Sequence, residues 1–217
     1  MSQSETQSSV TPDSVDLDRI QADGLSYEAY LSHWEAERTA DLSEDADADT
    51  RRMQHYLNYN HERQAGVHDA YTPSDDLKAV LNEINQPITW MVLTEPWCGD
   101  SAFSLPIIAE AAQAHPQSTL RILLRDSHLD MMDRFLTGGS RSIPKLVLLD
   151  ATGTVFGTWG PRPEPAQALY DRLNADGKDK MAIVKELLDW YDEGSWEHVD
   201  RELADVLRAV VPTASAA

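Results

Sequence analysis

The chain has 217 residues, of which 41% are hydrophobic, and this composition predicts a folded protein with one sizeable core. Its net charge of −19 disfavours nonspecific binding to nucleic acid or to anionic lipid. No segment approaches the roughly eighteen apolar residues of a membrane span, and the polar N-terminus does not resemble a secretory signal. Because the chain has a single cysteine, an internal disulfide is excluded, and we expect a soluble cytoplasmic protein.

The acidity comes from 37 acidic residues against 18 basic ones, and among the basic residues arginine outnumbers lysine. Two interpretations stay open. An acidic, lysine-poor surface suits a protein from a salt-adapted host such as a halophilic bacterium, where salt screens the self-repulsion. It is equally compatible with an ordinary acidic cytosolic protein. Neither interpretation bears on the reaction.

The first elements in chain order carry no recognisable chemistry. Residues 1–24 are polar and lack periodicity, which predicts a disordered tail. Residues 25–71 are expected to form an N-terminal helical extension. Its first helix follows the cap residue Ser26, and its second places four residues on one face: Met53, Tyr56, Leu57 and Asn60.

Residues 72–176 alternate between helical and strand patterns. A helix capped by Ser74 precedes "ITWMVLTE", an apolar run typical of a strand buried on both faces. "STLRILLRD", "KLVLLD" and "TVFGTW" predict further strands. The alternation predicts parallel strands, and the short turn "ATG" predicts a final antiparallel hairpin, so the fold class is α/β with a mixed sheet. Residues 177–211 are expected to form helices packed on the same domain, followed by a tail over 212–217.

The only cysteine, Cys98, lies in "TEPWCGDSAFSLPIIAEAAQA", where a buried strand runs into a helix. The N–H groups and dipole of that helix favour a thiolate and can lower a cysteine pKa from ~8.5 to roughly 3.5–7.5. Gly99 permits close approach of another backbone, and Trp97 offers an apolar platform beside the sulfur. The alternative is a buried cysteine that acts as a small hydrophobic residue. We favour an accessible, functional thiol.

"WCGDS" resembles the W-C-G-P-C active site of the thioredoxin family, and the resemblance extends from about residue 72 to 173. "SIPKLVLLD" is similar to the loop that carries the family's cis-proline, which makes Pro144 the matching proline and Ile143 the residue before it. The resemblance implies a three-layer thioredoxin-like fold, with helices on both faces of the sheet and extra helices at both ends. "TEPWCGDSA", "RSIPKL" and "WGPRP" further resemble an uncharacterised bacterial branch whose W-C-G-D-[AS] site lacks the second cysteine.

The departures from the family pattern limit the chemistry. Ser101 replaces the resolving cysteine, Asp100 replaces the usual proline, and Val92 stands where thioredoxins place a buried aspartate. A dithiol mechanism is therefore excluded. The remaining chemistry is attack of the Cys98 thiolate on a disulfide, giving a mixed disulfide that a second thiol resolves. Ser101 is expected either to donate a hydrogen bond to the thiolate or to be a polar residue of an exposed first turn.

The resemblance also implies which residues face the substrate: Trp97, Gly99, Asp100, Ile143 and Pro144. The backbone beside Pro144 is expected to pair with an extended peptide or a glutathione-like thiol. Arg141 is the basic residue that we place nearest the site, where it would lower the Cys98 pKa or bind a carboxylate, the alternative being a surface ion pair. Glu95 and Asp100 would oppose a thiolate.

Cofactors and metals are not expected. The spacing of His55, His61 and His68 does not align them on one helical face, and no phosphate-binding glycine loop is present. The oligomeric state is left open by the sequence.

Two functions remain. The first is a monothiol oxidoreductase, with Cys98 and Ser101 as catalytic residues, that contributes to cell redox homeostasis and reacts with a protein disulfide or a low-molecular-weight thiol. The second is a redox-inactive module that binds a peptide on a surface formed by Trp97, Pro144 and Trp159. The pKa of the thiol distinguishes them, because a binding module needs no thiolate.

Overall fold

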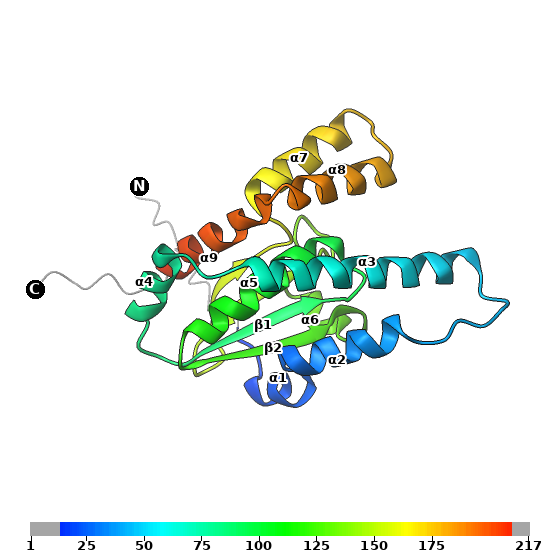
Figure 1. Ribbon diagram of the computed structural model, residues 1–217. Helices are drawn as coiled ribbons and strands as arrows, with labels where there is room; N and C mark the ends of the chain where they lie inside the picture. The colour runs from blue at the N-terminus through cyan, green and yellow to red at the C-terminus, as the bar shows by residue number, and fades with distance from the viewer. Residues whose placement is uncertain (1–13, 210–217) are drawn as a thin grey trace, which may run out of the picture.

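The computed structural model describes residues 14–209. Four strands form one sheet with the order β2-β1-β3-β4: β1 (Ile88–Thr94), β2 (Ser118–Leu124), β3 (Lys145–Leu149) and β4 (Val155–Trp159). Figure 1 labels β1 and β2. The helices are α1 (Leu17–Asp23), α2 (Tyr27–Arg38), α3 (Ala48–Ala70), α4 (Asp75–Glu83), α5 (Gly99–Ala114), α6 (Leu129–Met132), α7 (Glu164–Ala175), α8 (Lys180–Asp192) and α9 (His198–Arg208), with 3-10 turns η1 (Arg125–Ser127) and η2 (Ser195–Glu197). The predicted α/β fold with extra helices at both ends is confirmed. In the described part of the chain, no helix is long and apolar enough to cross a membrane.

Strand β1 lies at the centre of the sheet and divides the core into two parts. Successive side chains of a strand point to opposite faces. Trp90 and Val92 pack in the larger core with α3, α4, α5 and α9, and Met91 and Leu93 pack in the smaller one. Both faces of β1 are therefore buried, which explains the continuous apolar run in its sequence.

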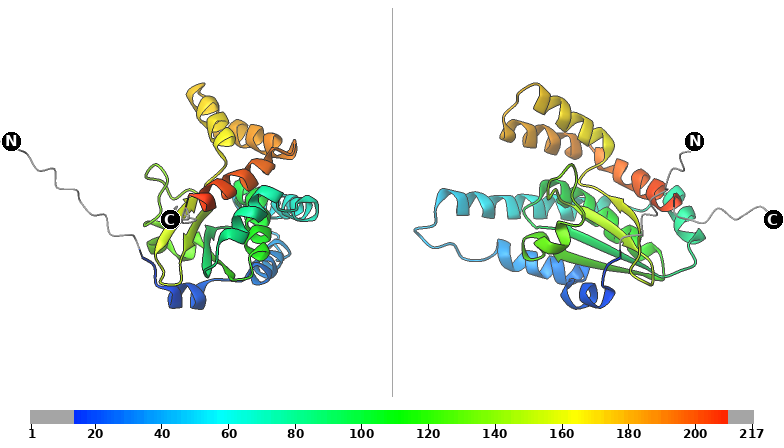
Figure 2. Two further views of the ribbon diagram at one scale, coloured as in Figure 1. Left: turned by 90° about the vertical axis from the view of Figure 1, so that its left-hand side faces the viewer. Right: turned by 180° about the vertical axis from the view of Figure 1, so that it is seen from behind.

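The two faces of the sheet are covered unequally. In Figure 1, α3 and α5 lie in front of the sheet, and α7 and α8 form a helical hairpin above it in this view. Seen from behind in Figure 2, the strands face the viewer and α1 lies along their lower side. The smaller core is closed by residues from α1, α6 and the following loops, including Ile20, Met131, Met132 and Phe135.

The cap residues that the sequence predicted are confirmed. The hydroxyl of Ser26 accepts the N–H of Ala29, and that of Ser74 accepts the N–H of Leu77, each at 3.1 Å. Each side chain satisfies one of the free N–H groups that begin a helix, so the local sequence sets where α2 and α4 start.

The predicted tail over residues 1–24 needs correction from residue 14 onward. Residues 17–23 form α1, whose first N–H groups are capped by Asp16, and Ile20 is fully buried in the smaller core. Arg19 also pairs with Asp130 at 2.6 Å. A helix of seven residues with one buried residue has too little periodicity to be visible in the sequence, because tertiary packing stabilises it. Residues 1–13 and 210–217, including the tail expected over 212–217, lie outside the described residues.

The strand directions also differ in one respect from the prediction. Strands β1 and β2 are parallel, but β3 runs antiparallel to β1 as well as to β4. The helix between β2 and β3, α6, has four residues, so it is about 6 Å long. The rest of the connection over 125–144 holds only the turn η1 and loop, and Leu93 near the end of β1 pairs with Lys145 at the start of β3. The chain therefore enters β3 from the end where β1 stops, which is the end that carries Cys98.

If α1 belongs to the core, Ile20→Ala will lower the free energy of unfolding by about 2–5 kcal/mol, because it leaves a cavity beside β1. Denaturant unfolding measures this change. Leu136→Ala is the matched control, since Leu136 is 40% exposed, and it is expected to change stability by less than about 0.5 kcal/mol. Equal effects of the two substitutions would show that α1 does not contribute to the core.

Candidate functional site

Cys98 lies between β1 and α5, at the N-cap position of the helix. A tight turn leads into it, since the N–H of Cys98 donates to the carbonyl of Glu95 at 3.1 Å. The residue is only 8% exposed. Its Sγ donates a hydrogen bond to the carbonyl of Ile143 at 3.3 Å. The thiol is thus held against the loop that precedes β3.

That loop has the form that the family resemblance implied. The Ile143–Pro144 peptide bond is cis, and both residues are buried. The loop is held from behind by Gly160, whose φ is +105°, at the end of β4. A Cβ at this glycine would lie 2.2 Å from the carbonyl oxygen of Pro144, so only glycine fits here.

The pKa of the Cys98 thiol is raised to about 11, chiefly because burial disfavours the charged form. The negative charge of Asp100 raises it further, whereas hydrogen bonding to Ser101 and the charge of Arg162 act in the opposite direction with smaller effect. The sequence predicted a lowered pKa from the helix N-terminus. That prediction is wrong for this state of the protein, because desolvation outweighs the favourable interactions at the start of the helix.

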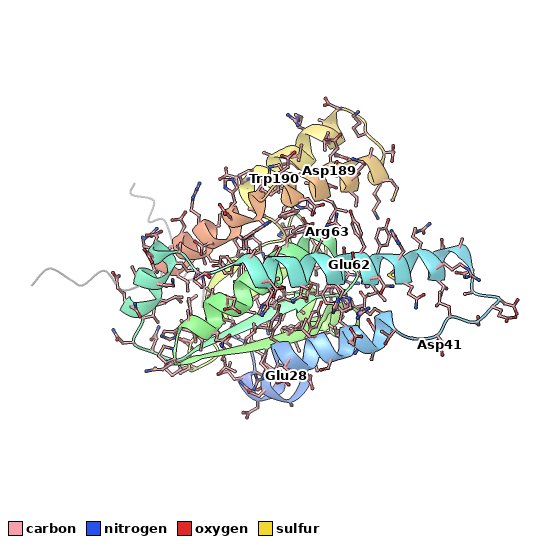
Figure 3. The ribbon with its side chains drawn as sticks, viewed as in Figure 1. Glu28, Asp41, Glu62, Arg63, Asp189 and Trp190 are labelled. Carbon is pink, nitrogen blue, oxygen red and sulfur yellow. The ribbon has the colours of Figure 1, made fainter. Side chains whose placement is uncertain are left out.

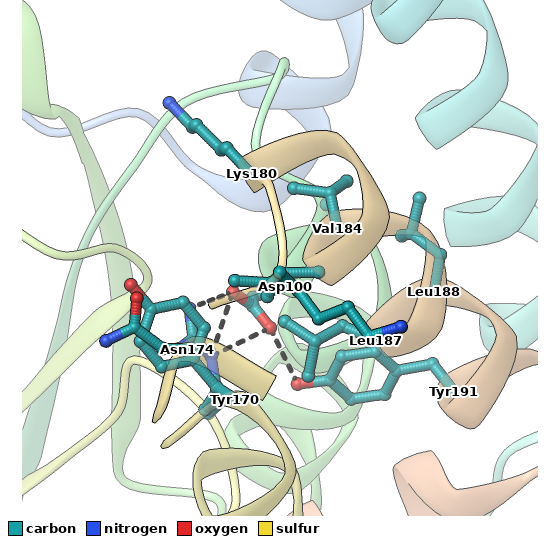
Figure 4. A pocket seen from close by; sticks show the side chains of 12 residues that line it. Asp100, Tyr170, Asn174, Lys180, Val184, Leu187, Leu188 and Tyr191 are labelled. Atoms are coloured by element: carbon teal, nitrogen blue, oxygen red, sulfur yellow. Dashed lines mark hydrogen bonds and ion pairs between the residues drawn. The ribbon is translucent and has the colours of Figure 1, made fainter. Parts of the chain in front are cut away.

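Asp100, which replaces the usual proline, forms a part-buried ion pair. Its carboxylate accepts hydrogen bonds from Nη2 of Arg162 at 2.8 Å and from the hydroxyl of Tyr191 at 3.0 Å (Figure 4). The two side chains of the pair are only 13–14% exposed. The guanidinium of Arg162 also lies over the ring of Tyr170, 4.6 Å from its centroid. The carboxylate that we expected to face substrate is therefore occupied within the protein.

Ser101 lies beneath the sulfur rather than on an exposed turn. It is 2% exposed, and its hydroxyl shares a hydrogen bond of 2.5 Å with the hydroxyl of Thr94. Hydrogen bonding to Ser101 lowers the pKa of Cys98, which agrees with the first of the two roles that the sequence suggested. Val92 is fully buried in the larger core, so no carboxyl group occupies its position.

Arg141 does not reach the sulfur. It pairs with Asp133 on the surface, with Nε 2.7 Å from the carboxylate, so the alternative of a surface ion pair is correct. Arg125 lies against Trp97 instead, with its guanidinium 4.9 Å from the centroid of the ring. Arg125 also donates to the carbonyl of Arg141 at 3.2 Å, so only the backbone of Arg141 belongs to this region.

A carboxyl group lies close to the turn before Cys98. Glu95 is 7% exposed and accepts the N–H of Asp126 at 2.7 Å. Burial raises its pKa. Tyr30 is fully buried, and its pKa is raised chiefly by that burial and further by the charges of Cys98 and Glu95. Burial thus disfavours negative charge on both side chains.

Helices α3 and α8 wall a cleft of about 680 Å³ that opens over Cys98. Five of the predicted site residues line it: Trp97, Cys98, Gly99, Asp100 and Ile143. The other three, Ser101, Pro144 and Arg141, are not part of its lining. The close neighbour of Gly99 is a side chain rather than a backbone, because a Cβ there would lie 3.1 Å from Cδ2 of Leu188.

Contacts from both helices fix these walls. The amide of Asn60 on α3 donates to the carbonyl of Pro96 at 3.4 Å. Arg63, labelled in Figure 3, reaches from α3 to α8 and pairs with Asp192 at 2.5 Å. The rings of Phe103 and Tyr191 stack with their centroids 4.5 Å apart, which joins α5 to α8. The terminal helices therefore belong to the architecture of the site.

Sequence reasoning missed several of these residues. The helical face with Met53, Tyr56 and Asn60 was visible, and it lines the cleft, but its role was not. Arg162 and Tyr191 gave no signal, because their hydrogen bonds to Asp100 span 62 and 91 residues. Within residues 14–209, no group of three His, Cys, Asp or Glu side chains is placed to hold a metal ion.

Substituting Asp100→Asn is expected to lower the pKa of Cys98, because it removes a negative charge and leaves that of Arg162 beside the sulfur. Each unit of decrease multiplies the thiolate fraction at neutral pH about tenfold. The pH dependence of Cys98 alkylation by iodoacetamide, followed by intact mass, measures the change. Asp133→Asn is the control, since Asp133 pairs with the exposed Arg141. A midpoint for Asp100→Asn equal to that of the unmodified protein would contradict the electrostatic role of Asp100.

A family model described as thioredoxin matches residues 47–177, which is more than half of the chain. No curated protein matches this chain. Among solved structures, a protein of unknown function from Pseudomonas aeruginosa is similar with a TM-score of 0.56 and 17% identity, over 89% of this chain and 97% of that one. An HIV epitope scaffold has a TM-score of 0.56 and 18% identity, over 90% and 98%. At these identities the likeness is one of fold.

Proposed function

The chain belongs to the thioredoxin family, and on that premise we propose that it is a monothiol thiol–disulfide oxidoreductase acting through mixed disulfides at Cys98. We place it in the bacterial branch whose W-C-G-D-[AS] site lacks the second cysteine. The observation that carries the proposal is the contact between Sγ of Cys98 and the carbonyl of Ile143, 3.3 Å apart beside a cis-proline at the floor of a cleft. A sulfur in this position is next to a surface that a disulfide can enter.

The exchange begins when the Cys98 thiol loses its proton and the thiolate attacks one sulfur of a disulfide. A new S–S bond forms to Cys98, the substrate S–S bond breaks, and the departing thiolate takes up the proton that Cys98 released. Ser101 has no sulfur with which to resolve the adduct. A second thiol from solution therefore attacks the mixed disulfide and restores Cys98.

The raised pKa of Cys98 makes this exchange slow at neutral pH. With a pKa of about 11, roughly one thiol in ten thousand is ionised at pH 7. A thiolate of high pKa is intrinsically more nucleophilic, which offsets part of this loss. The rate is thus expected to rise with pH throughout the range from neutral to about 11.

The second candidate is the redox-inactive binding module, and the same raised pKa together with the low exposure of Cys98 favours it. Its surface differs from the expectation. The indole of Trp159 is buried and donates to Glu202 at 2.7 Å, so a peptide would contact Trp97 and Ile143 instead.

Incubation of the native protein with bis(2-hydroxyethyl) disulfide is expected to give a single mixed disulfide on Cys98, at a rate that rises with pH. Intact mass detects the adduct, and an added small thiol is expected to remove it. Cys98→Ser is the control and must give no adduct. If the adduct forms only after the protein is unfolded, the exchange proposal is wrong and the binding module remains.

A further inference from the structure

The cleft above Cys98 has a charge opposite in sign to that of the whole protein. Its lining includes Arg52, Arg162 and Lys180 but a single carboxylate, Asp100, whereas the chain carries a net charge of −19. Asp100 is neutralised by Arg162 at 2.8 Å. Counted over the lining residues alone, positive charges exceed negative ones by two.

These two cations come from opposite walls. Arg52 lies on α3 and Lys180 is the first residue of α8. Arg52 is paired with Asp49 at 2.8 Å in an exposed ion pair, whose interaction is weak in water. Lys180 has no hydrogen-bond or ion-pair partner among residues 14–209. Its neighbour Asp179 is engaged as the cap of α8 and accepts the N–H groups of Met181 and Ala182 at 3.0 Å.

Apart from Asn60 and Ser142, most of the other residues that line the cleft are apolar. Met53 and Tyr56 of α3 face Met181 and Leu188 of α8, and the hydroxyl of Tyr56 lies 3.5 Å from Sδ of Met181. The volume of about 680 Å³ falls within the range of roughly 300–1,000 Å³ that is usual for small-molecule sites. Two helices thus enclose a space suited to a small ligand rather than to a folded protein surface.

We propose that the cleft selects small disulfides that carry a carboxylate, with the carboxylate toward Lys180 and Arg52 and the disulfide over Cys98. This inference rests on the proposed function and names its substrate class. At physiological ionic strength charges are screened beyond about 8 Å. A small anion in the cleft therefore interacts with the two local cations more strongly than with the distant acidic surface.

The covalent step is the exchange already described, with a small anionic disulfide as the oxidant. The Cys98 thiolate forms a bond to the nearer sulfur, and the farther half leaves as a thiolate that takes up the released proton. Both halves of the disulfide keep their carboxylates. The only change of charge in the cleft is that of the sulfur.

The test compares three disulfides of similar size: 3,3′-dithiodipropionate, which is anionic, bis(2-hydroxyethyl) disulfide, which is neutral, and cystamine, which is cationic. The rate of adduct formation on Cys98 is measured for each by intact mass. Because the leaving thiols differ in pKa, the rate for each charged disulfide is divided by the rate for the neutral one. This ratio of rates is then compared between the native protein and each variant. The variants are Lys180→Glu and, as the matched control, Lys185→Glu, whose exposed side chain lies on the same helix outside the cleft.

In Lys180→Glu the ratio for the anionic disulfide is expected to fall at least fivefold, the effect of one unit charge about 4 Å away in water. The ratio for cystamine is expected to rise, and Lys185→Glu is expected to change neither ratio by more than about twofold. Damage to the fold cannot produce opposite changes for the two compounds. In about 1 M salt both changes are expected to shrink, because the screening length falls to about 3 Å.

Other outcomes overturn the inference in distinguishable ways. If all three disulfides react with the native protein and the ratios are the same in Lys180→Glu, the selectivity is absent and the exchange function stands. If the disulfides of insulin react faster than the anionic compound at equal concentration, the substrate is a polypeptide. If no disulfide reacts until the protein unfolds, the exchange function is wrong and the inference falls with it.

Discussion

The structure around the sulfur depends on the part-buried ion pair between Asp100 and Arg162. Asp100 lies in the first turn of α5, Arg162 lies in the turn after β4, and Tyr191 adds its hydroxyl from α8. A buried charge that loses its partner is strongly destabilising, so each of the three segments constrains the other two. The pair replaces a proline that the family carries beside its cysteine, and it ties the C-terminal hairpin to the first turn of the helix.

The same arrangement accounts for both the low reactivity and the selectivity that we infer. Because α8 is held over α5, Cys98 is buried and its thiol pKa is raised. Because α3 is held on the other side by Asn60 and Arg63, the two helices enclose a cleft above that sulfur. Burial lowers the fraction of Cys98 that is ionised. The helices that bury it also form the walls of the cleft, from which Lys180 and Arg52 interact with a ligand at short range. An open active site would have a more reactive thiol and less discrimination among substrates.

Local patterns in the sequence predicted what depends on neighbouring residues. The apolar run of β1 and the caps Ser26 and Ser74 were available from short segments. The cis bond before Pro144 was implied by the family resemblance alone. The partners of Asp100 were not, because residues 62 and 91 positions away meet only after the chain has folded. The prediction of the Cys98 pKa was wrong for a related reason. The start of a helix can be predicted from the sequence, whereas the burial that outweighs its dipole comes from tertiary packing. The division of the chain into an extension, a thioredoxin-like domain and C-terminal helices stays a prediction.

The central claim is that folding itself keeps the Cys98 thiol protonated. Because the chain has one cysteine, selective labelling with 13C at Cβ gives a single resonance that reports the ionisation of this sulfur. The account predicts a titration midpoint near 11 in the native protein and one near ~8.5 after unfolding in guanidinium. A native midpoint at or below the unfolded one would contradict it, since burial and Asp100 would then not control the thiol.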